Sequence, residues 1–296
     1  FPRRMVHVVA WNVLAPVWAL ECHFPGVDKT VLVDRNAKIL SQLSKLVAEG
    51  CVVFCLAEVE EEFFHFLRRH LEEEFHMFFG EHKNSLWSEW LPETHTAVPN
   101  GNALLLARSV FQQPTYSKME LSDDGNVAVV VTAEMVSSLV PVTIAAVHLE
   151  TENAGTRRDQ ATRLVARLRD EEARRPGGVT IVGGDLNSAR DDDELRPLHD
   201  HGLDFVSQRD GSTCFGYPLH EPIDHVLVKG HAASTPHESH PWVIDQQALD
   251  HKANGGCNRA SKEERGKRLE ESLRVFGSDH HPVGSVVALP ETSVMA

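Results

Sequence analysis

Four short apolar segments of this chain end in a side chain that can bind a cation or move a proton, and a fifth polar cluster precedes the last apolar segment. The polar residues at these places are Asn12, Glu58, His148, the pair Asp185 and Asn187, and the pair Asp279 and His280. Buried strands that stop at polar residues deliver them to the rim of a sheet. If the rims coincide, the oxygen donors can hold a hard cation such as Mg²⁺ or Mn²⁺, and the carboxylates and imidazoles can move protons.

Glu58 and Asp185 have the most informative surroundings. Glu58 directly follows an apolar run at 52–57, whereas the acids at 60–62 are typical of a helix N-terminus, where they complement the helix dipole. Asp185 follows two glycines that allow the backbone to approach a ligand, and Asn187 lies two residues further along. In an extended chain these two side chains point to the same side. Asn12, taken alone, is also typical of a turn.

Asp224 is a carboxylate inside the apolar segment 222–226. A buried carboxylate needs a partner, and a histidine is the natural one. Such a pair raises the pKa of the histidine and fixes its tautomer. Asp279 and His280 form a further pair, a metal ligand beside a base in a tight loop.

Size, charge and cysteine content restrict the class of protein. The chain has 296 residues, 42% of them hydrophobic, and the polar clusters spread from residue 12 to residue 280, so we expect a single domain over 1–296. No apolar run approaches the roughly 18–20 residues that span a bilayer. The five cysteines lack a zinc-type spacing, and no secretory leader precedes the first strand, which favours reduced thiols in an intracellular protein. A formal charge of −14 disfavours a grip on many duplex phosphates.

Hydrophobic periodicity predicts two packed sheets with helices outside, because helices alternate with strands in the first and third quarters and strands follow one another in the second. The predicted helices are 34–48, 60–75, 157–170 and a segment from 261 onward. Residues 80–100 are expected to be irregular. The predicted strands are 6–13, 52–57, 103–106, 127–133, 142–147, 179–184, 223–228 and 283–288.

The order of the motifs resembles that of the endonuclease/exonuclease/phosphatase superfamily, which has the DNase I-like fold. The resemblance covers nearly the whole chain, and its wording is closest to the deadenylase-like branch. The motifs are Trp-Asn-Val-Leu-Ala at 11–15, Leu-Ala-Glu-Val-Glu at 56–60, Gly-Asn-Ala-Leu-Leu at 101–105, Val-His-Leu at 147–149, Gly-Gly-Asp-Leu-Asn at 183–187, Ile-Asp-His-Val at 223–226 and Ser-Asp-His-His-Pro-Val at 278–283. The resemblance implies a four-layered α/β sandwich, with two mainly antiparallel sheets flanked by helices, and metal-dependent phosphoester hydrolysis.

The resemblance also implies roles for the site residues. Glu58 is the expected principal ligand of Mg²⁺ or Mn²⁺, with Asn12 and Asp279 nearby. Asp185 is expected to orient or deprotonate the attacking water, and Asn187 to hold the phosphate. His148 and His280 would stabilise the developing negative charge, with Asp224 holding His280.

Two positions depart from the patterns of related branches. Leu14 stands where apurinic-site endonucleases carry Asp, and Ala57 stands where the deadenylase-like branch usually carries Gln before the Glu. Gln160 resembles part of the helix that follows the His-Leu motif of the family.

The expected activity is that of a nuclease acting on single-stranded RNA from the 3′ end, because a few stacked bases and few phosphates can hold such a substrate on an acidic protein. Trp87 and Trp90 could stack on bases or anchor their loop, and Asn102 is a further candidate substrate contact. A basic segment over 252–274 could bind phosphate or form a salt-bridged surface helix. The alternatives are a phosphatase or phosphodiesterase for a small molecule or lipid, and a non-catalytic subunit that retains the fold.

Overall fold

The computed structural model describes residues 5–15, 18–19, 28, 30, 34–83, 99–123, 125–207, 213–214, 222–230, 240–242 and 262–289. Two six-stranded sheets form its centre. The first has the order β11-β12-β1-β2-β4-β3, and its strands in that order are His240–Trp242, Val283–Ala288, Met5–Asn12, Cys51–Glu60, Asn100–Ala107 and Phe75–Glu81. The second has the order β5-β6-β7-β8-β10-β9, with strands Phe111–Glu120, Val127–Met135, Pro141–His148, Val179–Asp185, Asp224–Lys229 and Asp204–Phe205.

Each sheet is mainly antiparallel, with one parallel pair at its centre. The parallel pairs are β1 with β2 and β7 with β8. Helix α1 (Arg35–Ala48) connects the first pair, and helix α3 (Ala154–Arg174) connects the second. A parallel pair needs such a crossover because its strands run in the same direction.

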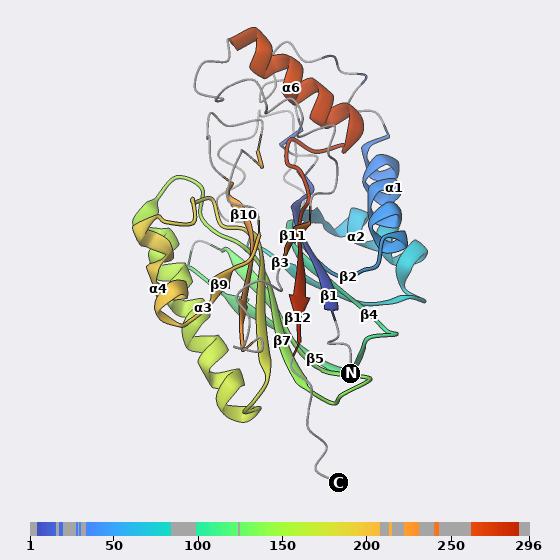
Figure 1. Ribbon diagram of the computed structural model, residues 1–296. Helices are drawn as coiled ribbons and strands as arrows, with labels where there is room; N and C mark the ends of the chain where they lie inside the picture. The colour runs from blue at the N-terminus through green and yellow to red at the C-terminus, as the bar shows by residue number, and fades with distance from the viewer. Residues whose placement is uncertain are drawn as a thin grey trace.

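Helices cover both outer faces, which gives the four-layered α/β sandwich (Figure 1). Helix α1 and helix α2 (Glu61–Leu71) cover the first sheet, and their apolar stripes pack on it in one cluster with Trp11 and Phe54. Helix α3, a 3₁₀ turn (Asp193–Leu195) and helix α4 (Arg196–Asp200) cover the second sheet. Between the sheets lies a third cluster of small and β-branched side chains, which suits the close approach of two sheet faces.

Within the described parts of the chain, the sequence predicted all eight interior strands and missed the four edge strands, β3, β5, β9 and β11. The helix expected at 60–75 is wrong at its C-terminal end, because α2 ends at Leu71 and Phe75 begins β3. The aromatic residues after Leu71 continue the apolar stripe of the helix in the sequence, but they belong to a strand. Residues 84–98, most of the segment expected to be irregular, lie outside the described residues.

The strand register explains why distant residues meet. His148 pairs with Asp185 across the parallel pair of the second sheet, and Asp224 pairs with Asp185 on its other side. In the first sheet Asn12 ends β1 beside Ala57, one residue before Glu58. The two sheets approach closely near this end. A Cβ added to Gly183 in β8 would lie only 2.8 Å from Sγ of Cys55 in β2. The same end of both sheets therefore carries the polar residues.

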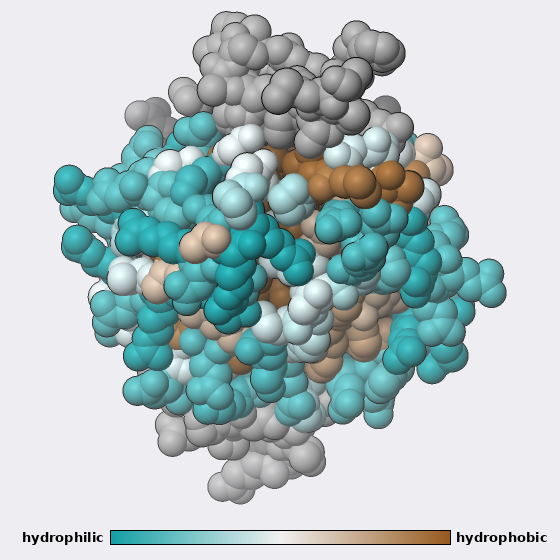
Figure 2. All heavy atoms as spheres, turned by 90° about the horizontal axis from the view of Figure 1, so that it is seen from below, coloured by the Kyte–Doolittle hydropathy of each residue, from teal (hydrophilic) through white to brown (hydrophobic). Residues whose placement is uncertain are grey.

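Helix α6 (Lys262–Val275) lies at the end of the sandwich that carries these residues and leads through 276–282 into β12. The surface of the opposite end is predominantly hydrophilic, with some hydrophobic side chains between the polar ones (Figure 2). Met5, Val136 and Leu139 are among its exposed apolar residues. Within the described part of the chain, no helix is both long and apolar enough to cross a membrane.

Candidate active site

The centre of the site is the carboxylate of Asp185, the last residue of β8. Its Oδ2 accepts a hydrogen bond from Nδ2 of Asn12 at 3.1 Å, and it lies 3.8 Å from Nε2 of His148 and 3.7 Å from Nε2 of His280. Its Oδ1 accepts the backbone N–H of Asn187 at 2.9 Å. Asp185 is 1% exposed, so these donors replace bulk water around the carboxylate. One carboxylate thus connects the polar ends of both sheets.

Glu58 reaches the same place from a bulge in β2. The pairing of β2 with β4 shifts register between Leu56 and Val59, and Glu58 between them has a φ of 56°. A left-handed conformation costs a residue other than glycine about 1–3 kcal/mol. The Glu58 carboxylate accepts hydrogen bonds from Nδ2 of Asn12 at 2.8 Å and from the backbone N–H of Ala15 at 2.9 Å. The bulge therefore turns the carboxylate toward the end of β1.

Asp224 holds the ring of His280. Nδ1 of His280 lies 2.8 Å from Oδ2 of Asp224, and both residues are buried. Burial disfavours a charge on the ring, but Cys214, Asp224 and Asp279 raise the pKa of His280 well above its ordinary value. Burial also raises the pKa of the Cys214 thiol, which is neutral at neutral pH for that reason, so the two carboxylates carry the effect. His280 consequently presents a protonated Nε2 to the site.

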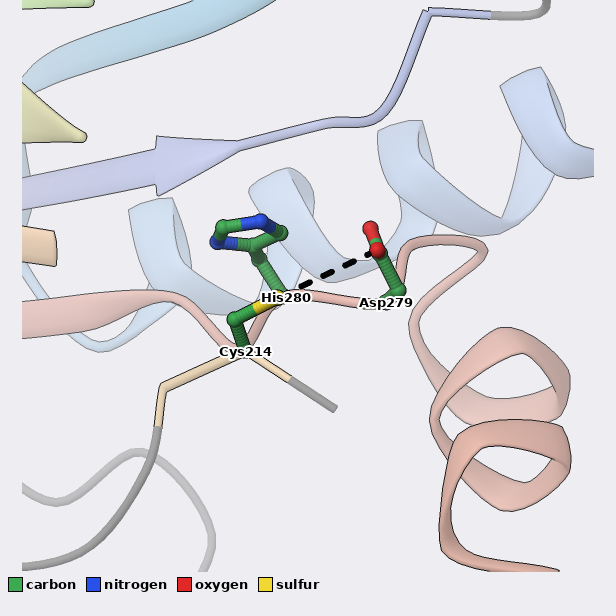
Figure 3. A group of neighbouring side chains, drawn as sticks. All are labelled: Cys214, Asp279 and His280. Carbon is green, nitrogen blue, oxygen red and sulfur yellow. Dashed lines mark hydrogen bonds between the residues drawn. The ribbon is translucent and has the colours of Figure 1, made fainter. Parts of the chain in front are cut away.

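Asp279 is a buried carboxylate with one oxygen that can still accept a hydrogen bond or bind a cation. It is 7% exposed, and its Oδ1 has no hydrogen-bond partner among the described residues. Burial raises the pKa of Asp279 to about 6; His280 opposes this rise, and the charge of Glu58 adds to it. Figure 3 shows the His280 ring and the Asp279 carboxylate on the same side of their turn, with Cys214 beside them. The thiol Sγ lies 4.0 Å from Oδ2 of Asp279.

His148, the last residue of β7, faces Asp185 from the other side. Its ring meets His82 edge-on, with centroids 6.3 Å apart, and its carbonyl accepts a hydrogen bond from Asn126 at 3.1 Å. Burial lowers the pKa of His82 to about 3. His82 is therefore neutral at physiological pH and adds no positive charge beside His148.

Asn187 does not continue the strand. Its φ is 49°, so the extended geometry expected from the sequence is wrong. The chain turns because Oδ1 of Asp185 accepts the N–H of Asn187, as in an Asx-type turn. Nδ2 of Asn187 donates to the carbonyl of Leu149 at 2.9 Å and makes a longer contact of 3.5 Å with Oγ1 of Thr151. The loop after β7 therefore orients the carboxamide.

Helix α3 supports that loop with two buried polar residues. Oε1 of Gln160 accepts the N–H of Glu150 at 2.8 Å. Arg157 donates to the carbonyls of Glu150 and Thr151 at 3.2 and 2.9 Å and forms an ion pair of 2.8 Å with Glu194. The resemblance pointed to this helix through Gln160, and the structure shows that it braces the loop on which Asn187 rests.

Sequence reasoning missed Arg35. An Arg at the start of an amphipathic helix is usually exposed, but this guanidinium is buried and donates to the carbonyls of Gly277 at 2.7 Å and Val13 at 2.9 Å. Burial lowers the pKa of Arg35, and the carboxylates of Asp279 and Glu58 oppose that effect. Arg35 therefore connects the loops after β1 and before β12 and places a positive charge beneath the acids.

Two hydroxyl groups also escaped sequence reasoning as site residues. Oγ of Ser278 donates to the carbonyl of Asn12 at 2.8 Å and accepts the N–H of His280 at 3.1 Å. Oγ1 of Thr213 accepts the N–H of Asp224 at 3.2 Å. Only contacts across the fold reveal these roles, because serine and threonine are ordinary in loops.

Within the described part of the chain, the structure does not bring the predicted substrate contacts to the carboxylate of Asp185. Asn102 lies in β4, fully buried, and its Nδ2 donates to the carbonyl of Val127 at 2.7 Å. Trp87 and Trp90 lie outside the described residues, as does the part of the basic segment before Lys262. Within that segment Arg274 forms ion pairs with Glu270 and Glu271, which is the salt-bridged arrangement considered above.

The donor set fits a divalent cation. Two buried carboxylate oxygens, Oδ1 of Asp224 and Oδ1 of Asp279, have no hydrogen-bond partner among the described residues. Glu58 and Asp185 add two further carboxylates joined through Asn12. Four acids in one buried place repel one another, and a cation removes that repulsion. Asp185 and Asp224 also form, with His280, one of the groups spaced closely enough to hold a metal.

The sequence matches the model of the Endonuclease/Exonuclease/phosphatase family over residues 9–280. The chain belongs to this family. Its enzymes are hydrolytic phosphoesterases that depend on divalent metal ions, and the donor set just described agrees with that chemistry. None of the curated proteins matches the chain significantly.

Solved structures of the family share the fold. The human Nocturnin catalytic domain with bound sulfate is 16% identical with a TM-score of 0.67, over 98% of this chain and 96% of that chain. ANGEL2, described as a 2′,3′-cyclic phosphatase, is 14% identical with a TM-score of 0.70, over 97% and 96%. Truncated Caenorhabditis elegans TDP2 is 14% identical with a TM-score of 0.58, over 96% and 97%. At these identities the likeness shows the fold alone.

Proposed function

We propose that the protein is a Mg²⁺- or Mn²⁺-dependent phosphodiesterase that shortens single-stranded RNA from its 3′ end. The observation that carries this proposal is the position of Asp185, whose Oδ2 lies within 3.8 Å of two imidazole nitrogens and 3.1 Å from an amide donor. A base surrounded by donors suits a reaction in which a proton leaves water while negative charge grows on phosphate oxygens.

The residues divide the work as follows. Asp185 accepts the proton of the attacking water as the water oxygen bonds to phosphorus and the bond to the leaving 3′ oxygen breaks. His280, held protonated by Asp224 and Asp279, donates its Nε2–H to a non-bridging phosphate oxygen, and His148 donates from the opposite side. Such preorganised donors are commonly the largest single contribution to catalysis.

Asn187 is proposed to hold the phosphate. One N–H of its carboxamide already donates to Leu149, and the second makes only the 3.5 Å contact with Thr151. That second N–H is therefore available to a phosphate oxygen with little rearrangement. Its backbone N–H meanwhile keeps Asp185 oriented.

Glu58, Asn12 and Asp279 are proposed to hold the metal ion. When bound, Mg²⁺ or Mn²⁺ supplies electrostatic stabilisation of the charge that develops on the phosphate. Oxygen donors of this kind suit Mg²⁺ and Mn²⁺. Asp279 contributes an oxygen that has no partner among the described residues.

The net charge restricts the class of substrate, and one observation on a protein with the same fold supports RNA ends. The charge of −14 favours a substrate gripped through few phosphates. The same fold in ANGEL2 has been solved with adenosine-2′,3′-vanadate, which resembles the terminal ribose of an RNA chain. The charge equally favours a small phosphorylated molecule, so a phosphatase for a nucleotide or phosphoinositide is the second candidate.

A panel of substrates tests the proposal. The panel comprises 5′-labelled oligoadenylate with a free 3′ hydroxyl, a 3′-phosphate or a 2′,3′-cyclic phosphate, the matching DNA oligonucleotide, free nucleotides and a phosphoinositide. We expect single-nucleotide shortening of the free-hydroxyl RNA with Mg²⁺, none with EDTA, and shortening that is at least about 100-fold slower with Asp185→Asn. Turnover of nucleotides or phosphoinositide with intact RNA would establish the second candidate instead.

A further inference from the structure

A thiol, a carboxylate and an imidazole converge at one wall of the site. Ligand atoms of Cys214, Asp279 and His280 all lie within 4.8 Å of one another, and all three residues are buried (Figure 3). Cys214 comes from a different segment of the chain than Asp279 and His280. An isolated antiparallel bridge pairs its backbone with that of His280. The backbone pairing therefore fixes the thiol beside the two other side chains.

This donor set differs chemically from the rest of the site. Asn12, Glu58 and Asp185 offer only oxygen and nitrogen of amides and carboxylates, which suit hard cations. A thiolate with an imidazole and a carboxylate suits a softer cation of the Zn²⁺ type, which takes three protein ligands and water in a tetrahedral site. Cys214 thus changes which metal this wall selects.

The geometry is close to that of such a site. Bond lengths of about 2.3 Å to sulfur and about 2.1 Å to oxygen give a tetrahedral S–O separation of about 3.6 Å. The observed separation between Sγ of Cys214 and Oδ2 of Asp279 is 4.0 Å. A movement of a few tenths of an ångström closes the difference.

A second observation points to a cation independently of the cysteine. Oδ1 of Asp279 is buried and has no hydrogen-bond partner among the described residues, although Oδ2 lies beside the thiol. A buried carboxylate oxygen without a donor is unfavourable, and a bound cation is one way to satisfy it.

We propose that Cys214, Asp279 and His280 form an inhibitory site for a thiophilic divalent cation of the Zn²⁺ type. The cation displaces the thiol proton of Cys214 and one imidazolium proton of His280 to solvent, and it bonds to sulfur, carboxylate and imidazole. Occupancy withdraws Asp279 from the proposed Mg²⁺ site and His280 from the phosphate. The site thereby makes the activity sensitive to inhibition by Zn²⁺, whereas a site built from oxygen donors alone would not select this softer cation. This inference adds a regulatory metal to the proposed hydrolase.

Cadmium binding tests the site without any assay of activity. Cd²⁺ is titrated into metal-free protein, and the thiolate-to-Cd²⁺ charge-transfer absorption in the ultraviolet reports bonding to sulfur. We expect Cys214→Ser to lose this signal and to weaken the corresponding binding at least about tenfold. Cys51→Ser is the matched control, because Cys51 is equally buried but lies at the start of β2, away from the site. It should retain the signal.

Asp279→Asn provides the second arm, since it keeps the thiol and removes a charged ligand. Its Cd²⁺ affinity should also fall at least about tenfold. Thermal unfolding without metal verifies that each variant is folded. Wild-type Cd²⁺ affinity and absorption in both folded variants would overturn the proposal. Where a substrate is known, Zn²⁺ inhibition, normalised to each variant's own Mg²⁺-dependent rate, should weaken in Cys214→Ser. Failure to find a substrate leaves the binding result decisive.

Discussion

Asp279 makes the metal-free protein less stable than it could be, and Asp279→Asn should show by how much. Burial raises the pKa of Asp279 from 3.8 to about 6. A carboxyl with a higher pKa in the folded state favours folding while it is protonated. That contribution is fully present below pH of about 4 and is lost as the pH rises through about 6.

The size of the effect follows from the difference in pKa. About two pKa units correspond to about 3 kcal/mol of unfolding free energy once the group is ionised in both states, near pH 7.5. At pH 4.5 the same linkage leaves a cost of only about 1 kcal/mol. Because Asn cannot ionise, Asp279→Asn should be up to about 3 kcal/mol more stable than wild type at pH 7.5. The gain should shrink to about 1 kcal/mol at pH 4.5.

Urea unfolding in EDTA at the two pH values measures these differences, and Asp191→Asn on the exposed surface serves as the control. At pH 7.5 the midpoint of thermal unfolding of Asp279→Asn should rise by about 5–10 °C. Saturating Mg²⁺ should stabilise wild type, by about 2.7 kcal/mol at a hundred times its dissociation constant, and the variant much less. The reasoning would be refuted if metal-free Asp279→Asn were no more stable than wild type at pH 7.5. It would also be refuted if the variant were stabilised by the same amount at pH 7.5 and pH 4.5.

Four further expectations concern the rest of the site and the fold. Asp185→Asn should lower kcat by about 10²–10⁴-fold with little change in KM, as expected for a lost general base; a near-normal kcat would contradict the proposed role. Glu58→Ala should raise the Mg²⁺ concentration for half-maximal rate at least about tenfold; an unchanged requirement would exclude it as the main ligand. Asp224→Asn should lower the pKa of His280, so the alkaline limb of the kcat profile should move to lower pH. Calorimetry should show one unfolding transition, as a single domain over 1–296 requires.

The limits of sequence reasoning follow the burial of the strands. The interior strands have neighbours on both edges and are covered on both faces, so they appear as continuous apolar runs. Edge strand β5 alternates exposed and partly buried residues, carries Pro114 and shifts register between Gln112 and Thr115. A half-exposed strand with a proline gives no clear signal in one sequence. The two-sheet architecture could therefore be predicted, whereas the edge strands that complete each sheet could not.

The candidate site divides in a similar way. Residues that end interior strands, such as His148 and Asp185, could be found because an apolar run that stops at a polar side chain is visible in the sequence. Arg35 and Cys214 could not, because neither ends such a run. Arg35 is at a helix start and Cys214 lies in a segment without periodicity, and only the packing of the two sheet ends brings them to the acids.

Glu58 and Asn187 show why candidate site residues that stand out in the sequence could not also be oriented from it. Both adopt left-handed φ angles, 56° and 49°, which alternation along a strand cannot predict. The cost of about 1–3 kcal/mol each is borne because neighbouring groups determine the conformation: Ala15 and Asn12 bond the carboxylate of Glu58, and Asp185 bonds the N–H of Asn187. Flat strands would point these side chains into the sheet faces. The two local turns instead bring the Glu58 carboxylate to Asn12 and Ala15, and the Asn187 carboxamide to Leu149 and Thr151.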